Sequence, residues 1–135
     1  SVPAHMQRHG WRIIPVNPYA DRLLGEPAYR TLAGVPEQVG LVDVFRPSLQ
    51  TPDIARQAVA AGATALWLQL GIASAEARAI AEDAGLLYVE DRCLVIEQRR
   101  LHLQAPHPLS RGSTGTGRFA SGCWRAAAAP DSRRR

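Results

Sequence analysis

The apolar residues of this chain fall into four short runs, separated by stretches in which apolar and polar positions repeat with a helical period. The runs cover residues 11–17, 41–45, 63–70 and 86–89. Short runs that are apolar on both faces and rich in β-branched residues are typical of strands buried in a parallel sheet. The run at 41–45, Leu-Val-Asp-Val-Phe, lies between a glycine and a proline, and we expect the sheet to be built around it.

Amphipathic stretches lie beside these runs and predict helices. The expected helices cover residues 2–9, 52–61, 74–84 and 94–103. Three of them are followed by a glycine, which commonly ends a helix, and Ser74 is a favourable N-cap for the third helix. Strands that alternate with helices form βαβ units, and such units build a parallel sheet. We therefore predict an α/β fold with a doubly wound parallel sheet in three layers.

Two parts of the chain have no clear period. Residues 19–24 predict a turn or a short helix, and residues 28–29 predict a brief edge strand. From Pro106 onward Gly, Ser, Thr, Ala and Arg dominate, a composition that predicts disorder. The chain therefore divides into a folded domain at 1–103 and a low-complexity Arg/Gly/Ala-rich tail at 104–135.

The length and composition suit a single globular domain. The 135 residues are 46% apolar, and no apolar run approaches the ~18–20 residues that would span a membrane. No secretory signal pattern is present, so we expect a cytoplasmic protein without membrane association. Cys93 and Cys123 form neither a disulfide framework nor a metal cluster, and the four histidines have no ligand spacing with them. We predict no metal site.

The net charge of +4 is distributed unevenly along the chain. All sixteen basic residues are Arg. Residues 1–97 hold eight Arg and eleven acidic residues, a net charge of −3, whereas residues 98–135 hold eight Arg and only Asp131, a net charge of +7. A basic tail can bind nucleic acid, but the slightly acidic body offers no electrostatic basis for it. We therefore do not expect nucleic acid as a partner.

The polar residues with the clearest chemistry follow the predicted strands. Ligands of open α/β sheets bind beyond the carboxyl ends of the strands. There, Arg46 can hold a phosphate with two parallel hydrogen bonds, next to the flat ring of Phe45. Amide side chains offer a donor and an acceptor, and a glycine lets a ligand approach the backbone. The candidate site residues are Asn17, Pro18, Phe45, Arg46, Gln69 and Gly71, a set that suits a nucleotide-like ligand with a neutral polar arm.

Four of these residues also have a plainer interpretation. An isolated Asn-Pro pair, here Asn17 and Pro18, commonly forms a turn. Phe45 fits an ordinary core position, and Arg46 fits a surface ion pair with a nearby carboxylate, Asp43 or Asp91. These alternatives stay open from the sequence.

Gln69 is harder to explain as structure alone, because an amide inside an apolar strand needs hydrogen-bond partners. Cys93 precedes an expected helix, where a thiol pKa can be lowered, but no histidine is near it in sequence and we interpret it as a structural thiol. No catalytic constellation and no Gly-rich phosphate loop is present in the sequence. The pattern predicts a binding protein without catalytic residues of its own.

Four segments carry a family resemblance. They are Ile-Ile-Pro-Val-Asn-Pro at 13–18, Val-Asp-Val-Phe-Arg at 42–46, Ala-Leu-Trp-Leu-Gln-Leu-Gly at 65–71 and Asp-Arg-Cys at 91–93. In this order they resemble the small bacterial CoA-binding proteins, Rossmann-like domains similar to the CoA-binding domain of the succinyl-CoA synthetase α subunit. The resemblance covers about residues 1–101. It implies coenzyme A as the ligand, with Asn17 and Pro18 near its nucleotide part and Phe45, Arg46, Gln69 and Gly71 along the rest of the groove.

The chain departs from this family at both ends. Members begin with a strand and a Gly-Ala-Ser-type loop that precedes the first helix, whereas residue 1 of this chain already falls in that helix. The strand would lie between those at 11–16 and 41–45. We therefore expect one of three outcomes. The fold is truncated at its N-terminus, another segment takes the place of the missing strand, or the fold is compromised. The basic tail after Leu103 is the second departure.

The function we expect is binding of coenzyme A or an acyl-CoA at the rim of a parallel sheet. One alternative is a component of an acyl-CoA synthetase or ligase, with its catalytic residues on a partner chain. A second is an NAD-type nucleotide-binding module, which is disfavoured because Asn17 and Pro18 stand where a ribose-binding acid is expected. A homodimer and a complex with a partner subunit both stay open.

Overall fold

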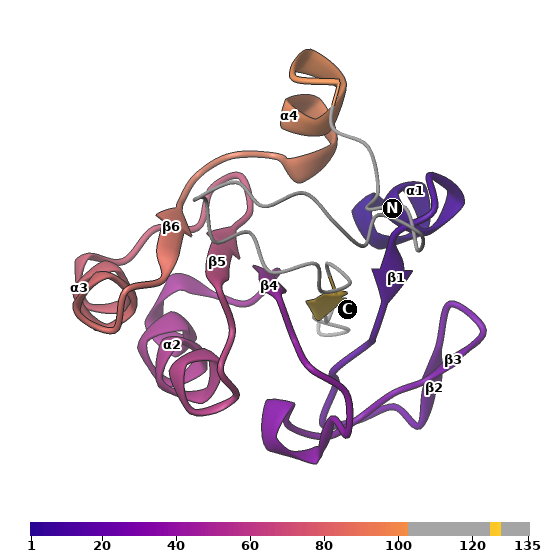
Figure 1. The fold of residues 1–135 in the computed structure, drawn as a ribbon, viewed down its shortest axis with the longest axis horizontal. Coiled ribbons are helices and arrows are strands. Elements are labelled where there is room, and N and C mark those ends of the chain that lie inside the picture. The colour runs from indigo at the N-terminus through magenta and orange to yellow at the C-terminus, as the bar shows by residue number, and fades with distance from the viewer. Residues whose placement is uncertain (103–124, 128–135) are drawn as a thin grey trace, which may run out of the picture.

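The computed structural model describes residues 1–102 and 125–127 of the chain. A five-stranded parallel sheet has the strand order β1-β7-β4-β5-β6, and an antiparallel hairpin, β2-β3, lies beside it (Figure 1). The strands are β1 (Arg12–Ile13), β2 (Arg22–Leu23), β3 (Glu26–Pro27), β4 (Leu41–Val44), β5 (Ala65–Leu68), β6 (Leu87–Val89) and β7 (Arg125–Ala127). The helices are α1 (Val2–Arg8), α2 (Thr51–Ala60), α3 (Ala75–Asp83) and α4 (Leu94–Arg100), with 3-10 turns η1 (Leu32–Gly34) and η2 (Ser48–Gln50).

The sheet is covered on both faces, which confirms the three-layer prediction. Helices α2 and α3 lie on one side of β4, β5 and β6, and α1 and α4 lie on the other (Figure 1). The alternation along β4 explains the two cores, because Val42 and Val44 pack toward α2 and α3 whereas Leu41 packs with Met6 and Leu94. The faces of α2 and α3 that are buried in the core carry alanine, whose small side chain lets a helix approach the sheet closely. These fully buried residues are Ala55, Ala58, Ala77 and Ala81.

The expected helix boundaries are confirmed within a few residues. The Ser74 side chain caps α3 by accepting a hydrogen bond from the Ala77 backbone N–H at 3.1 Å. Gly62 and Gly85 follow α2 and α3 with φ of +72° and +80°, the left-handed conformation that ends helices. Among the described residues no helix has the length and apolar character needed to cross a membrane.

The segment between the first two predicted strands differs in detail from the expectation. β1 ends at Ile13, and instead of a continuous strand to residue 17 the chain makes an isolated parallel bridge between Val16 and Tyr29. Within residues 19–24, where a turn or a short helix is expected, the chain makes a turn at 18–19, and residues 22–24 belong to the β2-β3 hairpin. Leu24 and Gly25 have φ of 55° and 75°, which is the geometry of a tight hairpin turn.

The slot between β1 and β4 is occupied by β7. It pairs in parallel with β1 through Arg12↔Arg125 and Ile13↔Ala126, and with β4 through Leu41↔Ala126 and Val42↔Ala127. The prediction of a tail without regular structure at 104–135 is therefore corrected at 125–127. Its composition was misleading because a strand in the middle of a sheet is held by backbone pairing on both sides, which needs no apolar run of its own. The rest of the predicted tail lies outside the described residues.

Candidate functional site

An open cleft of about 430 Å³ lies beyond the carboxyl end of β4, beside α2. Phe45 and Arg46, which follow β4, form part of its wall, and Pro18 from the loop after β1 forms another part. Helix α2 and the turn before it contribute Gln50 and Asp53. The cleft is at the end of the sheet where ligands of α/β proteins bind.

Two of the predicted side chains are adjacent in this cleft. Phe45 and Arg46 are both half-buried, and the Arg46 Nε donates a hydrogen bond to Gln50 Oε1 at 2.8 Å. Within the described residues, neither Asp43 nor Asp91 forms an ion pair with Arg46. The guanidinium is therefore held at one nitrogen by a neutral amide, which leaves its charge available to an anion in the cleft.

Asn17 holds the backbone around Pro18. Its Oδ1 accepts a hydrogen bond from the Tyr19 N–H at 2.8 Å, and its own N–H donates to the Tyr29 carbonyl at 2.8 Å. Asn17 is buried and does not line the cleft, whereas Pro18 does. The turn interpretation therefore describes the side chain of Asn17, and the loop that it fixes presents Pro18 to the cleft.

Gln69 is buried and has the partners that a buried amide requires. Its Nε2 donates to the Asp43 carboxylate at 2.5 Å, and its Oε1 accepts from the Leu94 N–H at 3.3 Å. Asp43 is also buried, and burial raises its pKa from 3.8 to about 7, although hydrogen bonds from Gln69 and the Val44 backbone lower it. Gln69 thus connects β4 and β5 to the first residue of α4. It does not line the cleft.

Gly71 is in the loop after β5, with φ of +82°. Its N–H donates to the Asp91 carboxylate at 2.7 Å, which ties this loop to the one after β6. A Cβ at this position would meet nothing within 4 Å, so the positive φ and not crowding favours glycine. Gly71 does not line the cleft either. The structure therefore brings Pro18, Phe45 and Arg46 together and assigns Asn17, Gln69 and Gly71 to the surrounding framework.

Arg30 was missed by sequence reasoning and lines the same cleft. Its NH1 donates to the Pro18 carbonyl at 3.1 Å, and its NH2 lies 3.8 Å from the exposed Asp21 carboxylate. Arg30 directly follows Tyr29, whose bridge to Val16 brings this segment beside the loop after β1. No sequence period marks that bridge, so the residue could be found only through the non-local pairing.

Phe45 also borders a second, apolar cavity of about 260 Å³. Its other walls are the start of α1, Pro15 and the turn of the β2-β3 hairpin, including Leu23 and Leu24. The aromatic ring is therefore shared between a cleft with two arginines and a cavity with almost no polar surface. A ligand with a charged end and a weakly polar end can occupy both sides of the ring.

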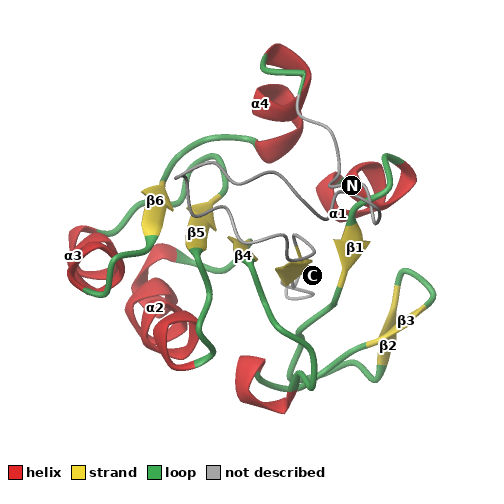
Figure 2. Cartoon of the chain, in the orientation of Figure 1, coloured by secondary structure: helices red, strands yellow, loops and turns green. Residues whose placement is uncertain are grey.

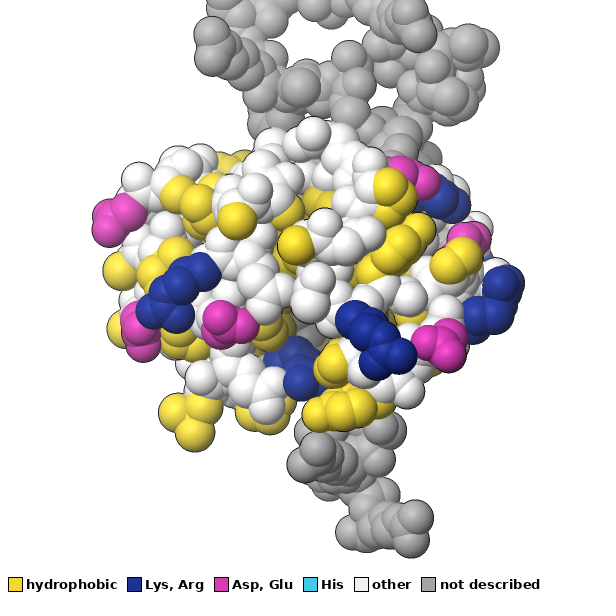
Figure 3. Space-filling model, turned by 90° about the horizontal axis from the view of Figure 1, so that it is seen from below, with side chains coloured by type: hydrophobic (Ala, Val, Ile, Leu, Met, Phe, Trp, Pro, Cys, Tyr) yellow, Lys and Arg dark blue, Asp and Glu magenta, His cyan; other side chains and the backbone are white. Residues whose placement is uncertain are grey.

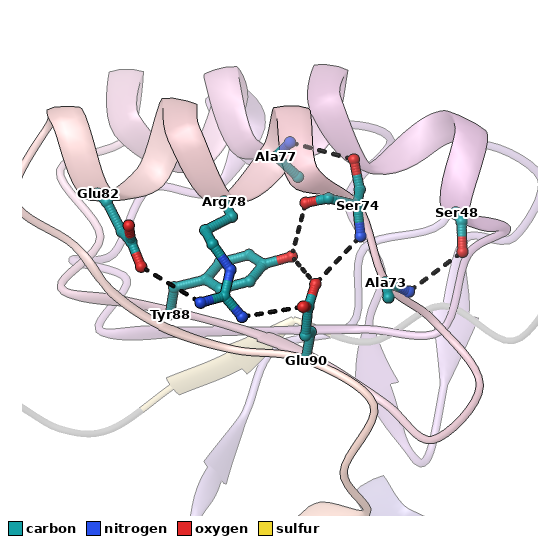
Figure 4. Close-up of polar contacts among 8 residues, drawn as sticks. All are labelled: Ser48, Ala73, Ser74, Ala77, Arg78, Glu82, Tyr88 and Glu90. Atoms are coloured by element: carbon teal, nitrogen blue, oxygen red, sulfur yellow. Dashed lines mark hydrogen bonds and ion pairs between the residues drawn. The ribbon is translucent and has the colours of Figure 1, made fainter.

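A network of polar contacts connects η2 and the end of β6 to the start of α3 (Figure 4). The Glu90 carboxylate accepts hydrogen bonds from the Tyr88 hydroxyl at 2.9 Å, from the Arg78 guanidinium at 2.9 Å and from the Ser74 N–H at 3.2 Å. Burial alone would raise the Glu90 pKa, but these three hydrogen bonds and the Arg78 charge lower it. The Ser48 hydroxyl accepts from the Ala73 N–H at 3.2 Å and joins this network to η2 (Figure 4). The rim beside the cleft is therefore cross-linked by side chains.

No group of His, Cys, Asp and Glu in the described part of the chain could hold a metal ion. Cys93 is a free, half-buried thiol directly before α4.

Comparison with known proteins gives consistent results. The family model described as a CoA binding domain matches residues 1–99. An uncharacterized protein of Bacillus subtilis (strain 168), YneT, is 34% identical over 95 residues, which are 70% of each chain. A solved structure from Thermus thermophilus, cell-free ID.343, has a TM-score of 0.71 and 37% identity and covers 74% of this chain and 76% of its own. A hypothetical protein from Pyrococcus horikoshii OT3 has a TM-score of 0.71 and 32% identity and covers 73% of this chain and 70% of its own.

Proposed function

Because this chain belongs to the CoA-binding domain family, we propose that it binds coenzyme A or an acyl-CoA in the cleft beyond the carboxyl end of β4. The observation that carries the proposal is the adjacency of Phe45 and Arg46 in one cleft at this end of the sheet. Coenzyme A combines a flat base and anionic phosphates with a long neutral arm. A guanidinium next to an aromatic ring offers complementary contacts to the first two of these parts.

The shared position of Phe45 supports an extended ligand. In the proposed arrangement the phosphates lie on the arginine side of the ring, and a weakly polar part of the ligand enters the apolar cavity lined by Leu23 and Leu24. Burying the weakly polar part against apolar walls is favourable, while the charged part keeps partners of opposite charge.

The six candidate residues then have two kinds of role. Pro18, Phe45 and Arg46 contact the ligand. Asn17, Gln69 and Gly71 hold the loops after β1, β5 and β6 by hydrogen bonds to Tyr19, Asp43 and Asp91. The proposal is one of binding and assigns no reacting group to this chain.

Titration calorimetry with coenzyme A tests the proposal on the chain of 135 residues. We expect saturable binding, and Arg46→Ala should weaken it about 10- to 100-fold, because a hydrogen-bonded charge pair is worth about 1.5–3 kcal/mol. Arg99→Ala is the matched control, since Arg99 is an exposed arginine on α4 and does not line the cleft. An equal loss in both variants, or none in Arg46→Ala, would refute the assigned cleft. Absence of binding by the unmodified chain at millimolar ligand would refute the function itself.

A further inference from the structure

We propose that Asp43 takes up a proton from solvent when coenzyme A occupies the cleft beyond β4, so that binding at this site is coupled to pH. The inference rests on the proposed function and adds a form of regulation to the same site. It starts from a carboxyl group that lines the cleft and is only 2% exposed. Among the described residues, Asp43 is the only acidic residue that is buried.

The hydrogen-bond partners of this carboxyl group are neutral. Gln69 Nε2 donates to Asp43 Oδ1 at 2.5 Å, and the Val44 backbone also forms a hydrogen bond with the carboxylate. Gln69 is itself held in place, because its Oε1 accepts a hydrogen bond from the Leu94 N–H at 3.3 Å. Asp43 is therefore fixed between two strands and the start of α4 without a positive charge as its partner.

The charged and titratable groups of the surrounding elements do not neutralise Asp43. Alternation along β4 places its side chain on the face covered by α1 and α4. β5 offers it only the neutral Gln69, and no ion pair joins it to a basic side chain in the part of the chain that the structure describes. The groups nearest in the fold are His5 on α1, Cys93 before α4, Glu97 on α4, Arg125 on β7, and Arg30, Arg46 and Asp53 around the cleft.

A buried carboxylate without a cation is unfavourable, because burial penalises the charged form. Burial is the main cause that raises the pKa of Asp43 to about 7, and the two hydrogen bonds oppose it. In neutral solution the group is therefore divided between its ionised and its protonated form before any ligand binds. A modest change in its surroundings is enough to shift this balance.

An anionic ligand in the cleft shifts the balance toward the protonated form. The ligand displaces water from the wall that Asp43 lines, which increases the desolvation of the carboxylate. Its phosphates also bring negative charge near the group, and like charges disfavour ionisation. Both effects raise the pKa of Asp43 in the complex, so binding is accompanied by proton uptake. By the reciprocity of linked equilibria, the ligand then binds more tightly as the pH falls through neutrality.

A second carboxyl group in the same cleft differs from Asp43 in its contact with water. On the face seen from below in Figure 3, acidic side chains lie at the outer surface around a recess with arginine and hydrophobic side chains. Asp53 lines the cleft but is exposed, and its Oδ2 accepts a hydrogen bond from Gln57 at 2.8 Å. Asp53 is therefore the matched control for a carboxyl group that shares the cleft without being buried.

Titration calorimetry with coenzyme A at pH 7.5, in two buffers of different ionisation enthalpy, measures the protons taken up per bound ligand. The unmodified chain should take up about 0.3–0.6 proton more than Asp43→Asn, in which the amide does not titrate. The subtraction removes protons bound by groups that both proteins share, including the 3′-phosphate of the ligand. Between pH 6.5 and 8.5 the affinity of the unmodified chain should fall about 3- to 10-fold more than that of the variant. Asp53→Asn should keep the proton uptake of the unmodified chain, whatever its affinity.

Infrared difference spectra of the unmodified chain give a second measurement that needs no variant. Coenzyme A has no carboxyl group, so a protonated-carboxyl band that grows when it binds must come from the protein. Equal proton uptake by the unmodified chain and a folded Asp43→Asn, or the absence of this band, would show the inference to be wrong while coenzyme A binding stands. If the unmodified chain does not bind coenzyme A at millimolar concentration, the proposed function fails and the inference fails with it.

Discussion

Strand β4 divides the sheet into two sides along the strand order, one containing β5 and β6 and the other containing β7 and β1, and these two sides are built in different ways. On one side, β4 and β5 pair along four positions, β5 and β6 along three, and α2 and α3 make the connections between these neighbours. On the other side, β7 pairs with β1 and with β4 along two positions each, and the chain from β1 to β4 is mostly loop (Figure 2). The first side consists of sequential βαβ units, whereas the second depends on a strand from the other end of the chain.

This difference indicates which wall of the cleft is preformed and which wall depends on contacts made elsewhere in the chain. Phe45 and Arg46 follow β4, which belongs to the continuous side and is buried along all four residues. Pro18 and Arg30 are in the loops of the other side, held by the bridge between Val16 and Tyr29. We expect the β4 wall of the cleft to be preformed and the opposite wall to depend on the pairing of β1 with β7.

The largest expected effect comes from the core of the continuous side. Leu68 on β5 is completely buried, so Leu68→Ala should lower the free energy of unfolding by about 2–5 kcal/mol. Ile13→Ala removes a buried side chain from β1, which packs in the smaller of the two hydrophobic cores, with Met6 and Leu94. The loss in the free energy of unfolding should therefore be smaller. Urea denaturation of both variants measures the difference. Equal losses would mean that the two sides are equally well packed and would remove the basis of the comparison.

The fold on the continuous side could be predicted from the sequence because its signals are local. Each element there is specified by a signal of its own: a short apolar run, a helix face of alanine, the Ser74 cap, or the glycine after α2 or α3. Elements that are neighbours in the chain are also neighbours in space. The strand β7 has no such signal. Its partners are more than eighty residues away in the chain, and three residues of backbone pairing leave no hydrophobic pattern.

The candidate site divides in the same way. Strand ends predict Phe45 and Arg46 at the rim, and both line the cleft. The same argument selected Gln69, but its position at a strand end does not show whether the side chain points into the cleft or into the core. In the structure the Gln69 side chain is buried, because it donates a hydrogen bond to the buried Asp43. Arg30 depends on the bridge at Tyr29 and could not be predicted from spacing.

The next largest effect concerns Asp43, on the strand where the two sides meet. Its pKa is raised from 3.8 in the unfolded chain to about 7 in the folded one, so the folded state binds the extra proton between these values. The stability contribution of this group is therefore complete below about pH 4 and is lost as the pH rises toward 7, with a slope of at most about 1.4 kcal/mol per pH unit. Chemical denaturation from pH 4.5 to 8 measures this loss.

Asp43→Asn isolates the contribution, because the amide keeps an acceptor for Gln69 but does not titrate. The free energy of unfolding of the variant should fall less than that of the unmodified chain over the same pH range. The carboxylate of Glu90 does not interfere with this measurement, because its pKa is lowered and its contribution to the free energy of unfolding changes in more acidic solution. Parallel pH profiles for the two proteins would show that Asp43 does not titrate in this window.

The smallest of these effects tests the side of the sheet that contains β1 and β7. Ala126 pairs with Ile13 on one side and Leu41 on the other, so Ala126→Pro removes a backbone donor from a strand that is inside the sheet. The expected loss is about 1–3 kcal/mol, the cost of leaving a buried acceptor without its partner. Ala126→Gly is the control, because it keeps the N–H and should cost only about 0.5–1 kcal/mol. Binding of coenzyme A should weaken along with stability in the proline variant, since Pro18 and Arg30 are on the side that β7 completes. A proline variant as stable as the glycine control would show that β1 and β4 keep their positions without this strand, and the cleft would then be preformed on both walls.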